Sequence, residues 1–235
     1  MEDDDQLGIA HLIEHMLFNG TKNYPKKKID EYLSSIGLQI GSDYNASTGY
    51  ETTTYTMEIP TDDIFKIEKG IHILSEMVGY ASLTDASFEK ERKIVEEEWR
   101  SDLGKNKRLY EEYQKYLYKN SKFAKRQPIG DMKIIKNFPY DTAKRFYYDW
   151  YRPDLMGIIA VGDFDPSYVK KIIDKYFSKL ENKNNRPMPS TLLPEYNDTI
   201  FLNQSDEEQT NILFTIRNKN KKLVLDTVRN FRKKL

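Results

Sequence analysis

The 235-residue sequence contains no cysteine, only three histidines and no excess of either charge, because 37 Lys and Arg residues balance 37 Asp and Glu residues. The absence of cysteine excludes disulfides and thiolate metal sites, so a metal would have to be held by histidine and carboxylate side chains. Zero net charge excludes a general attraction to nucleic acid or to an anionic membrane. No run reaches the roughly 18 apolar residues of a transmembrane helix, and the first residues are acidic where a signal peptide would be basic. We therefore expect a soluble chain with no transmembrane segment.

Two of the three histidines lie four residues apart in the segment His11-Leu12-Ile13-Glu14-His15. On a helix, at about 100° per residue, both imidazoles share one face and Glu14 lies beside them. The opposite face carries apolar residues that can pack into a core: Leu12, Ile13, Met16 and Leu17. A catalytic zinc ion needs such a pair of neutral nitrogens, an open position for water and a carboxylate that accepts the proton of that water. The segment is the inverted form of the His-Glu-x-x-His metalloprotease motif, although two ordinary structural histidines remain the alternative.

A catalytic zinc site needs a third protein ligand, and the helix predicted to begin at Asp85 offers two candidates. In helical projection Glu91 and Glu98 fall within its apolar stripe, whereas most of its other charged residues fall on the polar side. A carboxylate turned toward a core needs a partner, and a zinc ion is one such partner. Pairing with arginine or lysine is one alternative. The other is that Asp102, on the same face, marks a helix end that turns into solvent.

The run from Gly8 to Thr21, followed by the segment from Glu91 to Glu98, resembles the pitrilysin and insulysin family of inverted-motif zinc peptidases. Within that family it is most similar to bacterial zinc peptidases of the processing-protease type, and the resemblance covers nearly the whole chain. It implies a zinc metalloendopeptidase that hydrolyses extended or unfolded peptides. It also assigns the roles within the site: zinc ligands His11, His15 and Glu98, general base Glu14, and supporting acid Glu91. The commonest family interval after the second histidine falls near Glu91, which stays open as the alternative third ligand.

The resemblance implies an α+β fold with a largely antiparallel sheet and helices packed on one face. This would be the first of two homologous halves, lacking its first strands. Residues 1–185 would form the zinc-binding catalytic domain, residues 186–198 a linker, and residues 199–235 the beginning of the second half. An exposed edge strand would bind substrate backbone through four residues: Asn45, Ala46, Ser47 and Thr48. Taken alone, those four residues are typical of an ordinary turn.

Periodicity and composition predict further elements without the resemblance. Residues 52–59 read as a strand that ends at Pro60, and residues 64–78 carry a helical apolar stripe. Residues 155–161 read as a buried strand, and residues 166–180 as an amphipathic helix. Helices and strands intermixed in this way favour a layered α+β or α/β architecture.

The resemblance also implies partners and a location. The second half, in the same protein or in a partner subunit, would supply residues that help to bind the substrate, so we expect little or no peptidase activity from this chain alone. The chain starts almost at the histidine helix, which suggests a larger parent protein. A bacterial cell-envelope or periplasmic location is implied by analogy.

Two other classes of function compete with the peptidase. A non-catalytic scaffold or peptide-binding subunit of the same fold is the main alternative, but such subunits tend to lose the constellation that is intact here. Nucleic-acid binding by the basic, Tyr-rich stretch 105–126 is disfavoured by its glutamates and its helical spacing. We expect no nucleic-acid partner.

Overall fold

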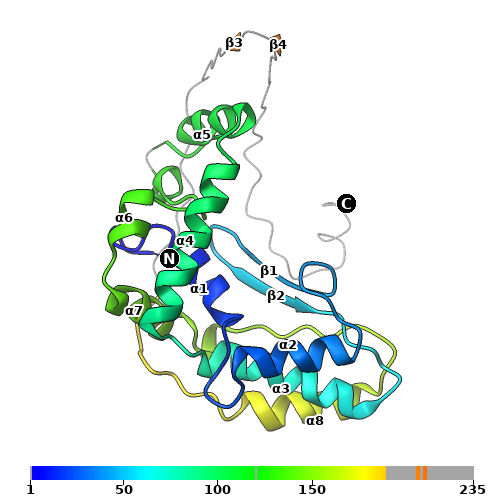
Figure 1. The fold of residues 1–235 in the computed structure, drawn as a ribbon. Helices are drawn as coiled ribbons and strands as arrows, with labels where there is room; N and C mark the ends of the chain where they lie inside the picture. Colours follow the sequence, from blue (N-terminus) through cyan, green and yellow to red (C-terminus); the bar gives the residue numbers. More distant parts are fainter. Residues whose placement is uncertain (1, 120, 189–204, 207–208, 211–235) are drawn as a thin grey trace, which may run out of the picture. The chain divides into compact units, whose positions relative to one another are not determined.

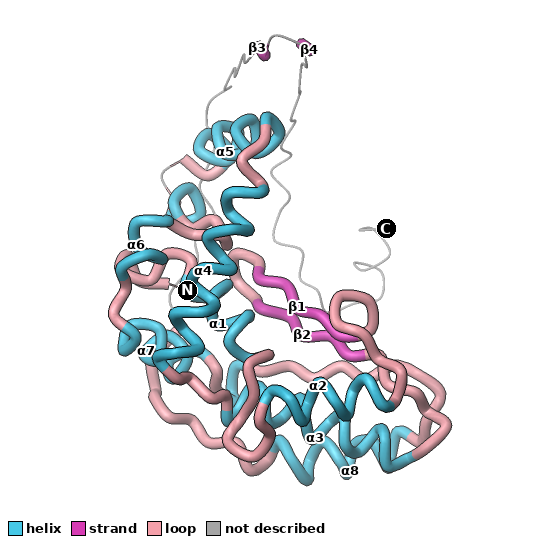
Figure 2. The backbone as a smooth tube through the Cα atoms, in the orientation of Figure 1, coloured by secondary structure: helices cyan, strands magenta, loops and turns pink. Residues whose placement is uncertain are grey.

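The computed structural model describes residues 2–119, 121–188, 205–206 and 209–210 (Figure 1). The chain divides into two compact units, Met1–Asp198 and Thr199–Leu235. Helices predominate among the described residues of the first unit (Figure 2). The elements in chain order are α1 (Ile9–Leu17), α2 (Lys26–Ser35), β1 (Tyr44–Thr48), β2 (Thr53–Met57), α3 (Ile64–Tyr80), α4 (Asp85–Ser101), α5 (Lys105–Leu117), η1 (Lys122–Lys125), α6 (Met132–Asn137), α7 (Tyr140–Trp150), η2 (Pro153–Leu155), α8 (Pro166–Phe177), β3 (Ser205–Asp206) and β4 (Gln209–Thr210).

Helix α1 lies in the core of the first unit, where it packs against α4, α7 and β1 (Figure 1). The four apolar residues of its predicted buried face are completely inaccessible to solvent: Leu12, Ile13, Met16 and Leu17. Large aromatic residues from α4 and α7, Phe88 and Tyr147, belong to the same cluster. The predicted separation of this helix into an apolar face and a histidine face is therefore confirmed, and it follows from the 3.6-residue period.

The predicted helices around residues 64–78 and 166–180 are confirmed as α3 and α8, which pack together. Their contact forms a second, smaller core built from Ile67, Ile71, Val169 and Ile172. Each helix begins at an aspartate whose side chain accepts hydrogen bonds from backbone N–H groups of the first turn, Asp63 in α3 and Asp165 in α8. These caps satisfy donors that a helix start would otherwise leave unpaired.

Strands β1 and β2 form an antiparallel hairpin with a continuous register from Tyr44 opposite Met57 to Thr48 opposite Thr53. The fold is thus helix-rich α+β with a small antiparallel sheet, and in the described part of the first unit that sheet has two strands. In the second unit, β3 pairs antiparallel with β4. Most of residues 199–235 lie outside the described residues, so the linker at 186–198 and the second half at 199–235 stay predictions.

The prediction of a buried strand over residues 155–161 was wrong. The short helix η2 ends at Leu155, no strand follows it among the described residues, and Ile159 and Val161 are each 90% exposed. An apolar run becomes a strand only when another edge lies within hydrogen-bonding reach. Here residues 157–159 line a cavity of about 600 Å³ whose lining also includes Thr53 and Tyr55 of β2.

The acidic start of the chain is held by arginines from distant parts of the sequence. Each aspartate has one short ion pair: Arg186 with Asp3 at 2.5 Å, Arg126 with Asp4 at 2.8 Å, and Arg145 with Asp5 at 2.7 Å. These contacts fix the segment that leads into α1. No helix within the described ranges is long and apolar enough to cross a bilayer.

Candidate metal centre

The two histidines of α1 lie one above the other on the face opposite the core. Their rings meet nearly edge to face, with centroids 4.7 Å apart and planes at 84°. The two Nε2 atoms are 3.3 Å apart, and both side chains remain partly accessible. The pair therefore presents two nitrogens to the same point in space.

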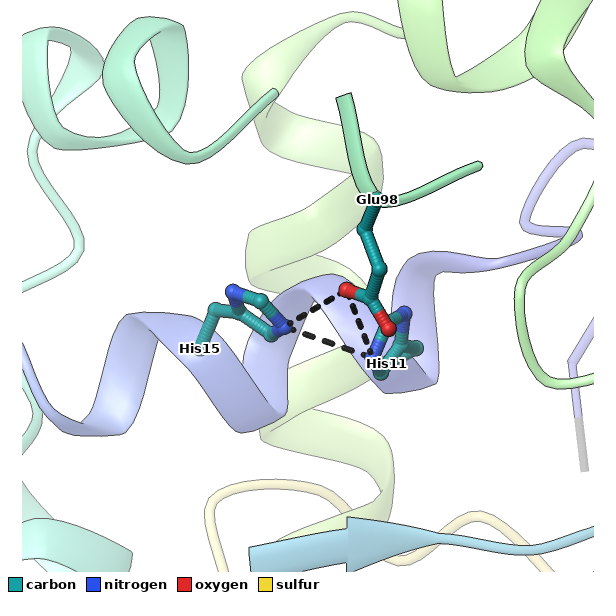
Figure 3. A group of neighbouring side chains, drawn as sticks. All are labelled: His11, His15 and Glu98. Atoms are coloured by element: carbon teal, nitrogen blue, oxygen red, sulfur yellow. Dashed lines mark hydrogen bonds and ion pairs between the residues drawn. The ribbon is translucent and has the colours of Figure 1, made fainter. Parts of the chain in front are cut away.

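Glu98, from α4, completes a triangle with these nitrogens (Figure 3). Its Oε2 atom lies 3.7 Å from Nε2 of His11 and 3.5 Å from Nε2 of His15. A triangle with these three sides has a circumscribed radius of about 2.0 Å, close to the 2.0–2.2 Å bonds of zinc to histidine nitrogen and carboxylate oxygen. The side chain of Glu98 is 47% exposed, so it lies at an accessible rim and not in the core as its place in the apolar stripe predicted. The donor set and its spacing both fit a zinc ion with an open coordination position.

Glu91 contacts the imidazole of His15 on the side opposite Glu98. Its Oε2 atom lies 3.4 Å from Nδ1 of His15, and its Oε1 atom accepts a 2.8 Å hydrogen bond from the side-chain amide of Asn19. A carboxylate on Nδ1 fixes the tautomer that leaves the Nε2 lone pair for a metal. The structure thus places Glu98 and not Glu91 among the three converging donors.

The local electrostatics differ between the two histidines. Burial alone would lower the pKa of His15, but its hydrogen bonds to Glu91 and Glu98 outweigh burial and raise it to about 9. A metal bound there must displace a proton, so its affinity depends on pH. Burial lowers the pKa of His11, whose buried Nδ1 atom has no hydrogen-bond partner within the described part of the chain.

Glu14 is buried beside the histidines and contacts β1. Its Oε2 atom accepts a 2.5 Å hydrogen bond from the hydroxyl of Thr48. Burial raises the pKa of the Glu14 carboxyl, and the bond from Thr48 opposes that effect. A carboxyl with a raised pKa is suited to accept and return a proton near neutral pH.

A cavity of about 550 Å³ joins the proposed base, two of the donors and β1. Its lining includes His11, Glu14 and Glu98, together with the β1 residues Ala46, Ser47 and Thr48. In the described residues β1 forms a sheet with β2, and its other edge has no strand partner there beyond an isolated bridge from Tyr44 to Ile40. Asn45, the remaining residue predicted to bind substrate, is exposed and outside the cavity lining, and its side-chain oxygen accepts a hydrogen bond from the N–H of Ala46.

Two contacts of the site were not predicted from the sequence. Asn19 lies one helical turn beyond His15, and that spacing could have indicated a shared face. The bond from Thr48 to Glu14 joins residues 34 positions apart, and no local pattern signals it.

Comparison with known proteins identifies the family of the chain. Residues 1–125, which contain all the residues of the candidate centre, match the family described as "Insulinase (Peptidase family M16)". The chain belongs to peptidase family M16. Residues 137–231 match a second description, "Peptidase M16 inactive domain".

Relatives within the family are named as zinc proteases. The "Probable zinc protease PqqL" of Haemophilus influenzae is 38% identical over 178 residues, covering 76% of this chain and 19% of that protein. The "Zinc protease PQQL-like" of Arabidopsis thaliana is 32% identical over 99% of this chain and 24% of its own length. The crystal structure of the first half of the periplasmic protease PqqL from Escherichia coli matches with a TM-score of 0.76 and 34% identity, over 83% of this chain and 41% of that one. The chain thus spans less than a quarter of the length of the two named sequence relatives, and its fold is that of a first half in this family.

Proposed function

We propose that this chain is the zinc-binding catalytic part of a metalloendopeptidase that acts on extended or unfolded peptides. One observation carries the proposal: the donor atoms of His11, His15 and Glu98 lie at mutual distances of 3.3–3.7 Å, which suit one zinc ion. The family and the names of its relatives support the same chemistry.

The residues of the centre divide the work of peptide hydrolysis among them. A zinc ion held by the three ligands supplies Lewis-acid activation of water and of the peptide carbonyl. Glu14 accepts the proton that the attacking water loses and returns it to the departing amine nitrogen. Glu91 keeps the imidazole of His15 in the tautomer and orientation that leave Nε2 free. The substrate binds β1 by pairing its own backbone with the edge of the strand that β2 does not occupy. Such binding favours extended peptides, and its specificity depends little on the substrate's side chains.

Metal analysis of the purified chain tests the ligand set. We expect about one zinc per chain, and loss of that zinc in His11→Ala and in Glu98→Gln variants. Glu97→Gln is a matched control on the same helix, because Glu97 is exposed and pairs with Arg100 away from the centre. Zinc retained in both ligand variants would contradict the site.

A Glu14→Gln variant tests the base. It should keep the zinc but lose about 10²–10⁴-fold in peptide cleavage, the range for a general base. A zinc-loaded variant that cleaves peptide at the wild-type rate would remove Glu14 from the mechanism. A non-catalytic peptide-binding subunit, the main alternative, would bind peptide equally well with or without zinc and would cleave none.

A second homologous half completes the proposed enzyme. The likeness to the first half of the Escherichia coli protease and the greater length of the relatives support this arrangement. We expect the chain alone to cleave unfolded peptides slowly or not at all, and rapid turnover by the isolated chain would contradict a need for the second half. We also extend to this chain the periplasmic location named for the Escherichia coli relative, which recovery of the native protein from the cytosolic fraction would contradict.

A further inference from the structure

The contact between Thr48 and Glu14 joins the strand proposed to receive the substrate to the carboxylate proposed to move the proton. The Thr48 hydroxyl donates to Oε2 of Glu14 at 2.5 Å. Among the described residues no hydrogen bond reaches the other oxygen, Oε1, of Glu14. The hydroxyl therefore occupies one oxygen of the base and leaves the second for a water molecule.

Further hydroxyl groups fix the direction of this hydrogen bond. The Thr48 oxygen lies 3.3 Å from the hydroxyl of Thr53, its partner across the hairpin. Thr53 is also a polar neighbour of Tyr151, whose hydroxyl lies 2.6 Å from the hydroxyl of Tyr55. An ionised carboxylate only accepts, so the single hydrogen of Thr48 points to Glu14 and its oxygen is free to accept from Thr53.

The two tyrosines form a buried hydrogen-bonded pair beside these hydroxyls. Burial raises the pKa of Tyr55 and of Tyr151 well above the usual range, so both phenols stay protonated at neutral pH. Hydrogen-bonded chains of this kind strengthen each other and hold their members in defined rotamers. Thr48 is thus held by Thr53 while its hydroxyl holds Glu14.

We propose that Thr48 is a positioning residue that couples peptide docking on β1 to the orientation of Glu14. This proposal rests on the proposed function and adds to it a link between substrate and base. Thr48, Ala46 and Ser47 line the same cavity as Glu14, so a peptide added to the edge of β1 lies against the residue that orients the base. A peptide that cannot extend along β1 does not contact Thr48 in this way and does not benefit from the positioning of Glu14. Extended peptides are therefore preferred in the catalytic step as well as in binding.

Kinetics of the zinc-loaded chain on an unfolded, quenched fluorescent peptide test the coupling. Thr48→Val removes the hydroxyl at nearly constant volume and should lower kcat about ten- to a hundredfold, the scale of a misplaced catalytic group, with KM changed less than about twofold. Thr48→Ser keeps the hydroxyl and should restore most of kcat. Thr54→Val is the matched control, because Thr54 is the exposed neighbour of Thr53 on β2.

A double variant separates positioning from direct substrate binding. If Thr48 acts through Glu14, then Thr48→Val should cause no further loss of kcat in a Glu14→Gln chain. A raised KM with unchanged kcat, a serine variant as slow as the valine variant, or a full additional loss in the Glu14→Gln background would each overturn the proposal.

Infrared spectroscopy of the metal-free chain tests the coupling without turnover. The difference spectrum between the chain and its Glu14→Gln variant isolates the carboxylate stretch of Glu14. That band should shift in Thr48→Val and return in Thr48→Ser, because an accepted short hydrogen bond perturbs a carboxylate. An unchanged band in the valine variant overturns the coupling. A wild-type chain that binds no zinc instead refutes the proposed function, so the two failures are distinguishable.

Discussion

Replacing Glu2 by glutamine should make the stability of the fold less dependent on pH. Glu2 is only 8% exposed, and its Oε1 atom accepts hydrogen bonds from the backbone N–H groups of Gly8, at 2.9 Å, and Ala10, at 2.8 Å. It therefore satisfies two donors at the start of α1, the helix that carries the proposed base and two proposed zinc ligands. Burial raises the pKa of the Glu2 carboxyl to about 7, although the two backbone hydrogen bonds oppose that shift.

The sign of the effect follows from the two pKa values of this carboxyl. The folded protein holds the proton up to about pH 7, whereas the unfolded chain releases it near the ordinary value of 4.5. The stability that Glu2 contributes is therefore complete below pH 4.5 and is lost as the pH rises through 7. Glutamine keeps an oxygen acceptor but has no charge. Relative to the Glu2→Gln variant, the wild-type chain should lose about 2.5 kcal/mol between pH 5 and pH 8.

Thermal unfolding at pH 5 and pH 8, for the wild-type chain and the Glu2→Gln variant, measures this difference. A loss of that size corresponds to a fall of about 5–10 °C in the wild-type Tm relative to the variant, for a domain of roughly 200 residues. Asp4→Asn is the control, because the Asp4 side chain is 93% exposed and its ion pair among the described residues is with Arg126. A wild-type chain that gains stability over the variant on going from pH 5 to pH 8 would refute the reasoning.

Three further predictions concern the same helix and its surroundings. Glu91→Gln should weaken zinc binding about 10- to 100-fold, because the Nδ1 partner of His15 loses its charge; competition with a chelator measures this, and unchanged affinity would contradict it. Leu12→Ala should lower the free energy of unfolding by about 2–5 kcal/mol, because Leu12 is fully buried in the main core; denaturant titration checks the value, and a loss below about 1 kcal/mol would be inconsistent with that packing. Gly130→Ala should lower the free energy of unfolding by about 2 kcal/mol or more, because Gly130 has φ +79° and the added Cβ would lie 2.3 Å from the Cα of Gly8 at the start of α1. The same titration tests this value. Gly37→Ala is the control for backbone strain alone, because Gly37 has φ +88° but open space around its Cβ position.

Helical periodicity was sufficient to predict the two helices that carry the candidate metal centre, whereas strand β1 was expected only from the family resemblance. The two faces of α1 follow from the positions of its apolar residues, and the same rule placed Glu91 and Glu98 on one stripe of α4. Periodicity could not show that Glu91 is buried while Glu98 is 47% exposed. The solvent exposure of a residue on α4 depends on how far along α4 the neighbouring helix packs against it, and a sequence pattern does not give that length.

Contacts between distant segments were beyond the reach of the sequence pattern. The hydrogen bond from Thr48 to Glu14 depends on how the hairpin packs against α1, and a local pattern carries no information on that packing. The apolar run at residues 155–161 has strand composition but no partner edge in the described structure, and composition alone cannot reveal a missing partner.

The seven-residue separation of Glu91 and Glu98 has a physical reason in this packing. Seven residues are nearly two helical turns, so the two carboxylates share one face of α4 at a rise of about 10.5 Å. The imidazole of His15 lies between them, with Nδ1 toward Glu91 and Nε2 toward Glu98, and the fully buried Val95 packs into the core between those turns. Glu91 can thus orient the ring through Nδ1 while Glu98 lies against Nε2, the proposed metal-binding nitrogen. In the proposed centre the two glutamates are therefore not interchangeable, since each reaches a different nitrogen of the same histidine.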